Sequence, residues 1–112
     1  MPYNVITTPH FDREMKRLSK KYASLKNEYK ALIEDLEENP EKGSALGNNL
    51  YKIRLAITSK SKGKSGGARV ITYLRTKQGN IYLLSIYDNG ERDTISDKEI
   101  IDILNSEIEE KE

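Results

Sequence analysis

Three cations on two neighbouring β-prone segments are the residues of this sequence best suited to chemistry. Lys52 and Arg54 lie in LYKIRLAI (50–57), where apolar and polar side chains alternate. This period of two predicts a strand whose i and i+2 side chains share a face, about 7 Å apart. Arg69 lies in the next β-prone segment, ARVITYLR (68–75), so a hairpin would bring it close to this pair. Each cation could instead extend along the sheet with its head in water. Because three like charges on one face repel, we expect an anion there.

The usual ribonuclease acids and bases are missing near these cations, so any RNA cleavage there would need lysine or arginine chemistry, without a metal or cofactor. Residues 43–87 carry eight cations and no Asp or Glu, so hydrolysis by carboxylates or a metal ion is not expected there. The only histidine, His10, is remote in sequence and is interpreted as structural or solvent-facing. Clustered cations lower the pKa of a lysine, which would let Lys52 act as base or acid for a 2′-hydroxyl attack. An arginine can stabilise the charge of a pentavalent phosphate.

The segment KSKGKSGGARV (60–70) joins the two strands and predicts a basic hairpin tip. A nucleotide-binding P-loop is excluded because Thr58 stands where its first glycine belongs and a strand, rather than a helix, follows. Gly66 and Gly67 would supply unusual backbone angles before the strand begins. The cations expected to contact an RNA backbone from this tip are Lys60, Lys62 and Lys64. Tyr73 and Arg75 share the parity of Arg69, so they would line the same surface and stack on or contact RNA.

Charge distribution supports a polyanionic partner. The net charge is +8 over residues 43–87 and −7 over residues 88–112, although the whole chain has a net charge of only +1. A solvated surface normally mixes both signs, and a strongly basic segment suits nucleic acid. The alternative is a solvated loop in which lysines serve solubility.

The remaining pattern predicts a single α+β domain spanning residues 1–112, with the order β-α-α-β-β-β-α. A short strand (3–7) precedes two amphipathic helices, the first capped by Thr8 and the second by Ser24, which form a hairpin packed on one face of an antiparallel sheet. Residues 41–49 read as a loop. Three strands follow as an antiparallel meander, with IYLLSIY (81–87) at the centre. A capping box, Ser96 with Glu99, opens a last helix, which we also expect on the one helical face.

Composition predicts a soluble cytoplasmic protein. The chain has 112 residues and no cysteine, which fits a reducing compartment. Its N-terminus lacks the pattern of a signal peptide, and its longest apolar run is too short to cross a bilayer. No membrane partner is expected.

Together, LYKIRLAI, the basic loop, GGARVITY, and IYLLSIY followed by NGER and a capped helix resemble the RelE/HigB superfamily of type II toxin–antitoxin toxins, most closely its HigB-like branch. The resemblance spans about residues 46–104. It implies a toxin that enters the ribosomal A site and cleaves mRNA there by 2′-hydroxyl attack, so that translation stops. Lys52 matches a strand lysine that contacts RNA and takes part in catalysis, and Arg69 matches the arginine on the scissile phosphate. Arg54 takes a position often held by lysine.

The resemblance also implies partners: mRNA, the ribosome with its rRNA, and a cognate antitoxin, usually of the helix-turn-helix type. The sequence departs from the pattern after the last strand. Asn89 stands near the position of a usual lysine, Arg92 is the only cation left in DNGER, and Ser96 replaces a terminal tyrosine. Tyr87 lies nearby but is out of register with that tyrosine. Two alternatives stay open: a ParE-like toxin of the same fold that inhibits DNA gyrase without nuclease activity, and a non-catalytic RNA-binding module.

Overall fold

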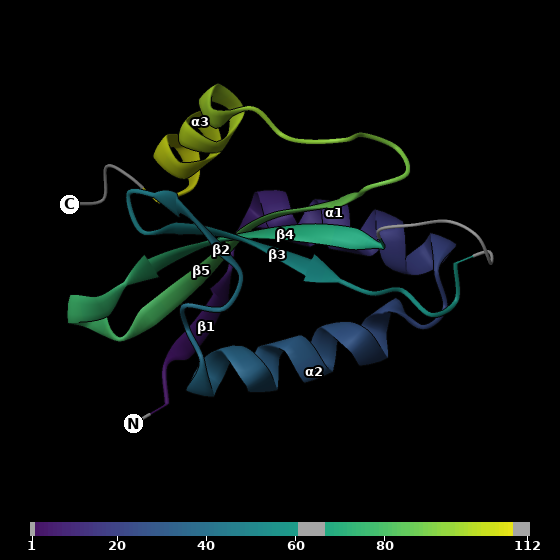
Figure 1. Ribbon diagram of the computed structural model, residues 1–112, viewed down its shortest axis with the longest axis horizontal. Coiled ribbons are helices and arrows are strands. Elements are labelled where there is room, and N and C mark those ends of the chain that lie inside the picture. Colours follow the sequence, from purple (N-terminus) through teal and green to yellow (C-terminus); the bar gives the residue numbers. More distant parts are fainter. Residues whose placement is uncertain (1, 61–66, 109–112) are drawn as a thin grey trace.

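The computed structural model describes residues 2–60 and 67–108, and it confirms the α+β class. The elements are β1 (Asn4–Thr7), α1 (Pro9–Lys21), α2 (Leu25–Glu38), β2 (Ser44–Gly47), β3 (Leu50–Leu55), β4 (Ala68–Arg75), the 3-10 turn η1 (Thr76–Gln78), β5 (Asn80–Asp88) and α3 (Asp97–Glu107). Figure 1 shows α2 and α3 on opposite sides of a central sheet, with α1 behind it.

The sheet has five strands in the order β1-β5-β4-β3-β2. The predicted antiparallel meander of β3, β4 and β5 is confirmed. The central strand is β4 rather than β5, which lies between β1 and β4 and so is not at an edge. Two further features differ from the prediction. β1 pairs with β5 in parallel, so the sheet is mixed. Residues 44–47, interpreted as loop, form the edge strand β2, whose four residues are all exposed and therefore lack the alternation that would mark a strand.

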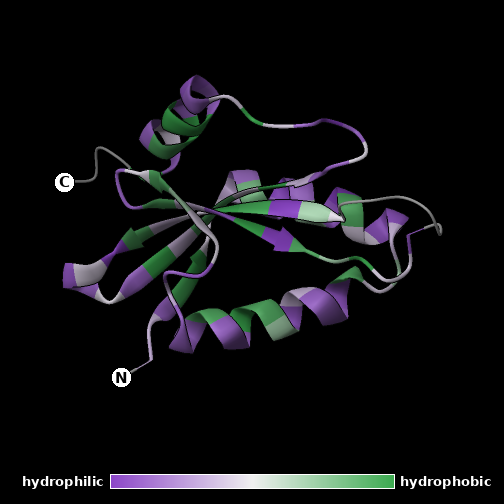
Figure 2. Cartoon of the chain, in the orientation of Figure 1, coloured by the Kyte–Doolittle hydropathy of each residue, from purple (hydrophilic) through white to green (hydrophobic). Residues whose placement is uncertain are grey.

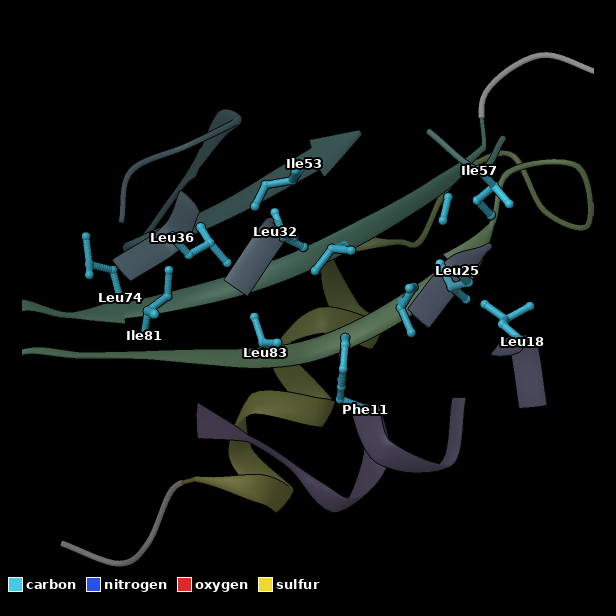
Figure 3. Packing of buried hydrophobic residues seen from close by; sticks show 13 residues of the cluster. Phe11, Leu18, Leu25, Leu32, Leu36, Ile53, Ile57, Leu74, Ile81 and Leu83 are labelled. Carbon is cyan, nitrogen blue, oxygen red and sulfur yellow. The ribbon is translucent and has the colours of Figure 1, made fainter. Parts of the chain in front are cut away.

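The helical hairpin packs on one face of the sheet, as predicted. Thr8 accepts a hydrogen bond from the Phe11 N–H and caps α1, with Pro9 at its first position. Ser24 occupies the N-cap position of α2 as predicted, but its side chain makes no capping hydrogen bond, and its hydroxyl contacts Glu28 and Ser59 instead. Figure 2 shows apolar and polar residues alternating along both helices. The apolar stripes bury against the inner residues of β3, β4 and β5 in the core shown in Figure 3.

The helix α3 lies on the opposite face of the sheet, which corrects the expectation that all helices share one face. Its capping box is as predicted, with Ser96 and Glu99 bonded reciprocally. Ile100 packs against Leu50, Ile71 and Leu84, which project from the sheet side away from the hairpin. Figure 1 shows α3 over only part of that side.

Gly67 fixes where the chain re-enters the sheet. Its φ is +59°, and a Cβ at this position would collide with the backbone carbonyl of Leu55. The predicted use of Gly67 as a turn residue is confirmed, whereas Gly66 lies outside the described residues.

Gly67→Ala should therefore lower the unfolding midpoint markedly, because both the left-handed φ and the collision must be relieved. The matched control is Gly79→Ala, since Gly79 has a similar φ of +69° and open space around it. The control should cost about 1 kcal/mol. Thermal unfolding followed by circular dichroism measures both, and equal losses would contradict the close approach at Gly67.

Candidate anion-binding site on the sheet

The predicted convergence of three cations rests on strand register. Arg54 on β3 faces Arg69 on β4 directly, and Arg69 in turn faces Tyr87 on β5. Directly opposed side chains have Cβ atoms about 5 Å apart. Lys52, two residues before Arg54, faces Ile71 and so lies on the same side of the sheet. The structure therefore brings Lys52, Arg54 and Arg69 onto one face of the sheet, the cation face.

Among residues 2–60 and 67–108, Lys52 and Arg54 are accessible and form no ion pair with an acid. Arg54 is exposed, while Lys52 and Arg69 are half-buried. The Arg69 guanidinium donates to the Ala68 carbonyl oxygen at 3.2 Å. Adjacent like charges with open faces favour a bound anion such as a phosphate.

Tyr87 is a site residue that the sequence reasoning missed. It lies beside Arg69, and its hydroxyl is buried with no hydrogen-bond partner in the described part of the chain. The Arg92 guanidinium lies 5.4 Å from the centre of its ring, a cation–π contact. Strict alternation along β5 would have put Tyr87 on the other face. The one signal that could have indicated otherwise is Ser85, a polar residue that interrupts the apolar run.

Arg92 is held in place from α3. Its Nη2 donates to the Glu99 carboxylate at 2.6 Å and its Nε donates to the Thr94 carbonyl oxygen at 3.1 Å. The hydrogen bond from Arg92 lowers the pKa of Glu99. The structure thus places Arg92 at the rim of the cation face, with its charge partly balanced by Glu99.

Lys60 does not lie with these cations, which corrects its placement on an exposed tip. Its ammonium is buried and pairs with Asp88 at 2.8 Å, and it also donates to the Gly67 carbonyl oxygen at 3.3 Å. Tyr22 from the end of α1 donates its hydroxyl proton to the same carboxylate at 2.5 Å. These contacts join the residues that flank the basic loop to the end of β5. Lys62 and Lys64 lie outside the described residues.

Asp88 is the centre of this network. Burial raises the pKa of its carboxyl, but hydrogen bonds from Lys60, Tyr22 and the Gly90 N–H outweigh that effect and lower the pKa to about 2. The Asp88 side chain is only 2% exposed. It faces the same side as Ala68, away from the cation face. The one acid of β5 is therefore kept apart from Arg69.

Tyr73 and Arg75 lie toward the other end of β4, on the parity of Arg69 as expected. Tyr73 is half-buried and its ring centre lies 6.3 Å from that of Tyr82. Arg75 faces Asn80. Because α3 packs near Tyr73, this end is more enclosed than the Arg54–Arg69 end. Asn89, which stands where the family resemblance leads us to expect a lysine, donates its backbone N–H to the Gly67 carbonyl oxygen.

His10 lies on α1 rather than on the strands that carry the cations, and it is half-buried. Its Nε2 lies 3.2 Å from Glu14 on α1. Among residues 2–60 and 67–108, no three or more His, Asp or Glu side chains gather in a way that could hold a metal ion. Within the same ranges, no helix has the length and apolar character needed to span a membrane.

The fold and the site together define a small α+β protein with a cationic sheet face suited to phosphate. The family profile described as the RelE toxin of the RelE/RelB toxin–antitoxin system matches residues 4–107. The chain therefore belongs to the RelE toxin family. The narrower assignment to a HigB-like branch stays a prediction.

Solved structures share the fold at low sequence identity. A double mutant of the E. coli toxin RelE in the free state has a TM-score of 0.60 and 17% identity, covering 91% of this chain and 97% of that one. The intact E. coli RelBE toxin–antitoxin complex gives 0.59 and 16%, with 77% and 95% covered. The toxin–antitoxin complex RelBE2 from Mycobacterium tuberculosis gives 0.53 and 14%, with 79% and 92% covered. Identities this low support a common fold.

Proposed function

We propose that this RelE-family toxin is a metal-independent endoribonuclease that cleaves mRNA in the ribosomal A site and so inhibits translation. The observation that carries the proposal is the register of Arg54 with Arg69, with Lys52 on the same face. A phosphodiester is the anion that this face suits best, since arginine forks bind phosphate oxygens bidentately. The sequence resemblance assigns the same three positions to RNA.

The reaction would be a transfer within the RNA. The 2′-oxygen attacks the neighbouring phosphorus, the bond from phosphorus to the 5′-oxygen breaks, and the products are a 2′,3′-cyclic phosphate and a 5′-hydroxyl. Lys52 would take part in removing the 2′-hydroxyl proton or returning one to the 5′-oxygen. Arg69 would hold the negative charge of the pentavalent phosphate, and Arg54 would add a second positive charge.

Other residues would hold the substrate. Arg92 at the rim and Arg75 with Tyr73 along β4 are suited to contact phosphates and bases beyond the cleaved bond. Lys62 and Lys64 keep their proposed role in backbone binding. Lys60 does not, because its ammonium is already paired with Asp88. Since such a site is weak alone, the ribosome would supply the positioning of the mRNA.

We further propose that an antitoxin neutralises the chain. Two of the similar structures are toxin–antitoxin complexes, which supports a partner of this kind. The antitoxin would be of the helix-turn-helix type that HigB-like toxins usually bind. The chain would act in the cytoplasm, where mRNA and ribosomes are found.

The test is cleavage of mRNA by the purified chain with and without ribosomes. We expect cuts in ribosome-bound message that end in 2′,3′-cyclic phosphates. Asn89, which lacks the usual positive charge, favours the gyrase alternative. A supercoiling assay on the same preparation decides between them: gyrase inhibition without RNA cleavage would overturn the nuclease proposal and leave the family unchanged.

A further inference from the structure

A bulge in β5 decides which side chain stands beside Arg69. Ile71 faces Ser85 whereas Thr72 faces Leu83, so Leu84 has no partner on β4. The clusters show the result: Leu83 and Ile86 both pack against the helical hairpin, although they lie three positions apart, an odd number that strict alternation would put on opposite faces. Such an inserted residue reverses the alternation of all side chains that follow it.

Without the bulge the cation face would be different. Continuing the register of Thr72 with Leu83 would set Arg69 opposite Ile86. Asp88 would then lie on the same face, as the diagonal neighbour of Arg69. Its carboxylate would compete with a phosphate for the guanidinium. With the bulge, Tyr87 faces Arg69 and Asp88 is turned to Lys60 on the far side.

The bulge is held from outside the sheet by Glu14 of α1. One carboxylate oxygen, Oε1, accepts hydrogen bonds from the Ser85 hydroxyl at 2.8 Å and from the Ile86 N–H at 3.0 Å. The other oxygen lies 3.2 Å from His10 Nε2 on the same helix. Ser85 and Ile86 directly follow the unpaired Leu84. Glu14 therefore satisfies the polar groups that an irregular strand would otherwise leave buried without partners.

We infer that Glu14 is a positioning residue for the cation face: its carboxylate holds the β5 bulge that keeps Tyr87 beside Arg69 and Asp88 away from it. The part of this inference that concerns RNA rests on the proposed function. Glu14 contacts none of the cations itself. Glu14 acts through the register of β5, which its hydrogen bonds to Ser85 and Ile86 maintain.

The variants are Glu14→Ala, Glu14→Gln and Glu14→Met. Glutamine keeps one acceptor oxygen, and methionine keeps the length of the side chain but has no oxygen. Glu34→Ala is the matched control, since Glu34 is an exposed acid on α2 without a contact in the described part of the chain. Glu14 lies on a helix, where alanine and methionine are both favourable, so we expect all variants to fold.

Two structural measurements test, without RNA, whether Glu14 holds the β5 bulge. Exchange of the Ile86 amide hydrogen should become at least about tenfold faster in Glu14→Ala and Glu14→Met, and stay close to wild type in Glu14→Gln. Nuclear Overhauser contacts between Arg69 and Tyr87 should weaken in Glu14→Ala and Glu14→Met but not in Glu14→Gln. Unchanged exchange and unchanged contacts in both Glu14→Ala and Glu14→Met would overturn the inference.

A third measurement tests whether the hydrogen bonds of Glu14 affect RNA binding by the cation face. Affinity for a short RNA with 2′-deoxy substitutions, which cannot be cleaved, should fall about tenfold in Glu14→Ala and recover in Glu14→Gln. Lost Ile86 protection with unchanged affinity would overturn the positioning role. If wild-type protein neither binds free RNA nor cleaves ribosome-bound mRNA, the proposed function fails, and the two structural measurements still decide the role of Glu14.

Discussion

Arg69→Ala should lower the rate of mRNA cleavage by about 100-fold or more, because it removes the guanidinium that faces Arg54 and would stabilise the phosphate in the transition state. Arg69→Lys keeps the charge but lacks the planar fork, so we expect an intermediate loss. The measurement is a single-turnover cleavage assay on ribosome-bound mRNA. The same variants should relieve growth arrest when the chain is expressed alone.

The control for this prediction is Arg13→Ala. Arg13 is exposed on α1, and the described residues give it no ion pair. It should cleave like wild type and unfold at the same temperature. Full cleavage by a folded Arg69→Ala would contradict the role of the cation face, whereas equal losses in both variants would indicate a general effect of positive charge on ribosome binding.

Asp88→Asn should destabilise the fold by about 3 kcal/mol, because it leaves the buried Lys60 ammonium without its counter-charge. For a domain of this size that corresponds to a fall of about 10 °C in the unfolding midpoint. Asp102→Asn is the matched control, since its pair with Lys98 lies in solvent and should matter little. The double variant Asp88→Asn with Lys60→Met should lose less than the sum of the two single variants. Strict additivity would show that the pair is not coupled.

The same carboxylate predicts a dependence of stability on pH. The pKa of Asp88 is about 2 in the folded chain and 3.8 ordinarily, so the folded state holds fewer protons in this range. Its contribution is complete above about pH 5 and is lost as the pH falls from about 4 toward 2, for a total of about 2 kcal/mol. Urea unfolding at pH 6 and pH 2.5 should show a smaller loss in Asp88→Asn than in wild type. Equal losses would mean that Asp88 titrates normally.

Sequence periodicity was sufficient for most elements of the fold. Both hairpin helices, the meander and the cap of α3 carry local signals, namely apolar stripes, alternation and a Ser–Glu capping box. The side of the sheet on which α3 packs has no local signal, because both faces of β4 and β5 are apolar. Parallel pairing of β1 is likewise a long-range choice. β2 has only four exposed residues and no pattern at all.

Prediction of the site succeeded where strand parity alone sufficed. Lys52, Arg54 and Arg69 share a face because β3 and β4 pair without interruption over these residues. The site prediction failed where the position of a side chain depends on residues distant in the sequence. The charge of Lys60 suggested an exposed loop, but Asp88 and Tyr22 bury it. Tyr87 was missed because the bulge that turns it is stabilised by Glu14, which is about 70 residues away in sequence.

The parallel pairing of β1 with β5 also bears on how the chain folds during its synthesis. Asn4 faces Asn80, and their side chains are joined by a hydrogen bond across 76 positions. The first strand to leave the ribosome must therefore wait for the last one. Closing so long a loop is slow and is rewarded only when β5 docks. Because β5 also carries Tyr87, the sheet and the cation face should become complete in one cooperative step, late in translation. A nascent chain truncated before β5 would then have neither a finished sheet nor a finished site.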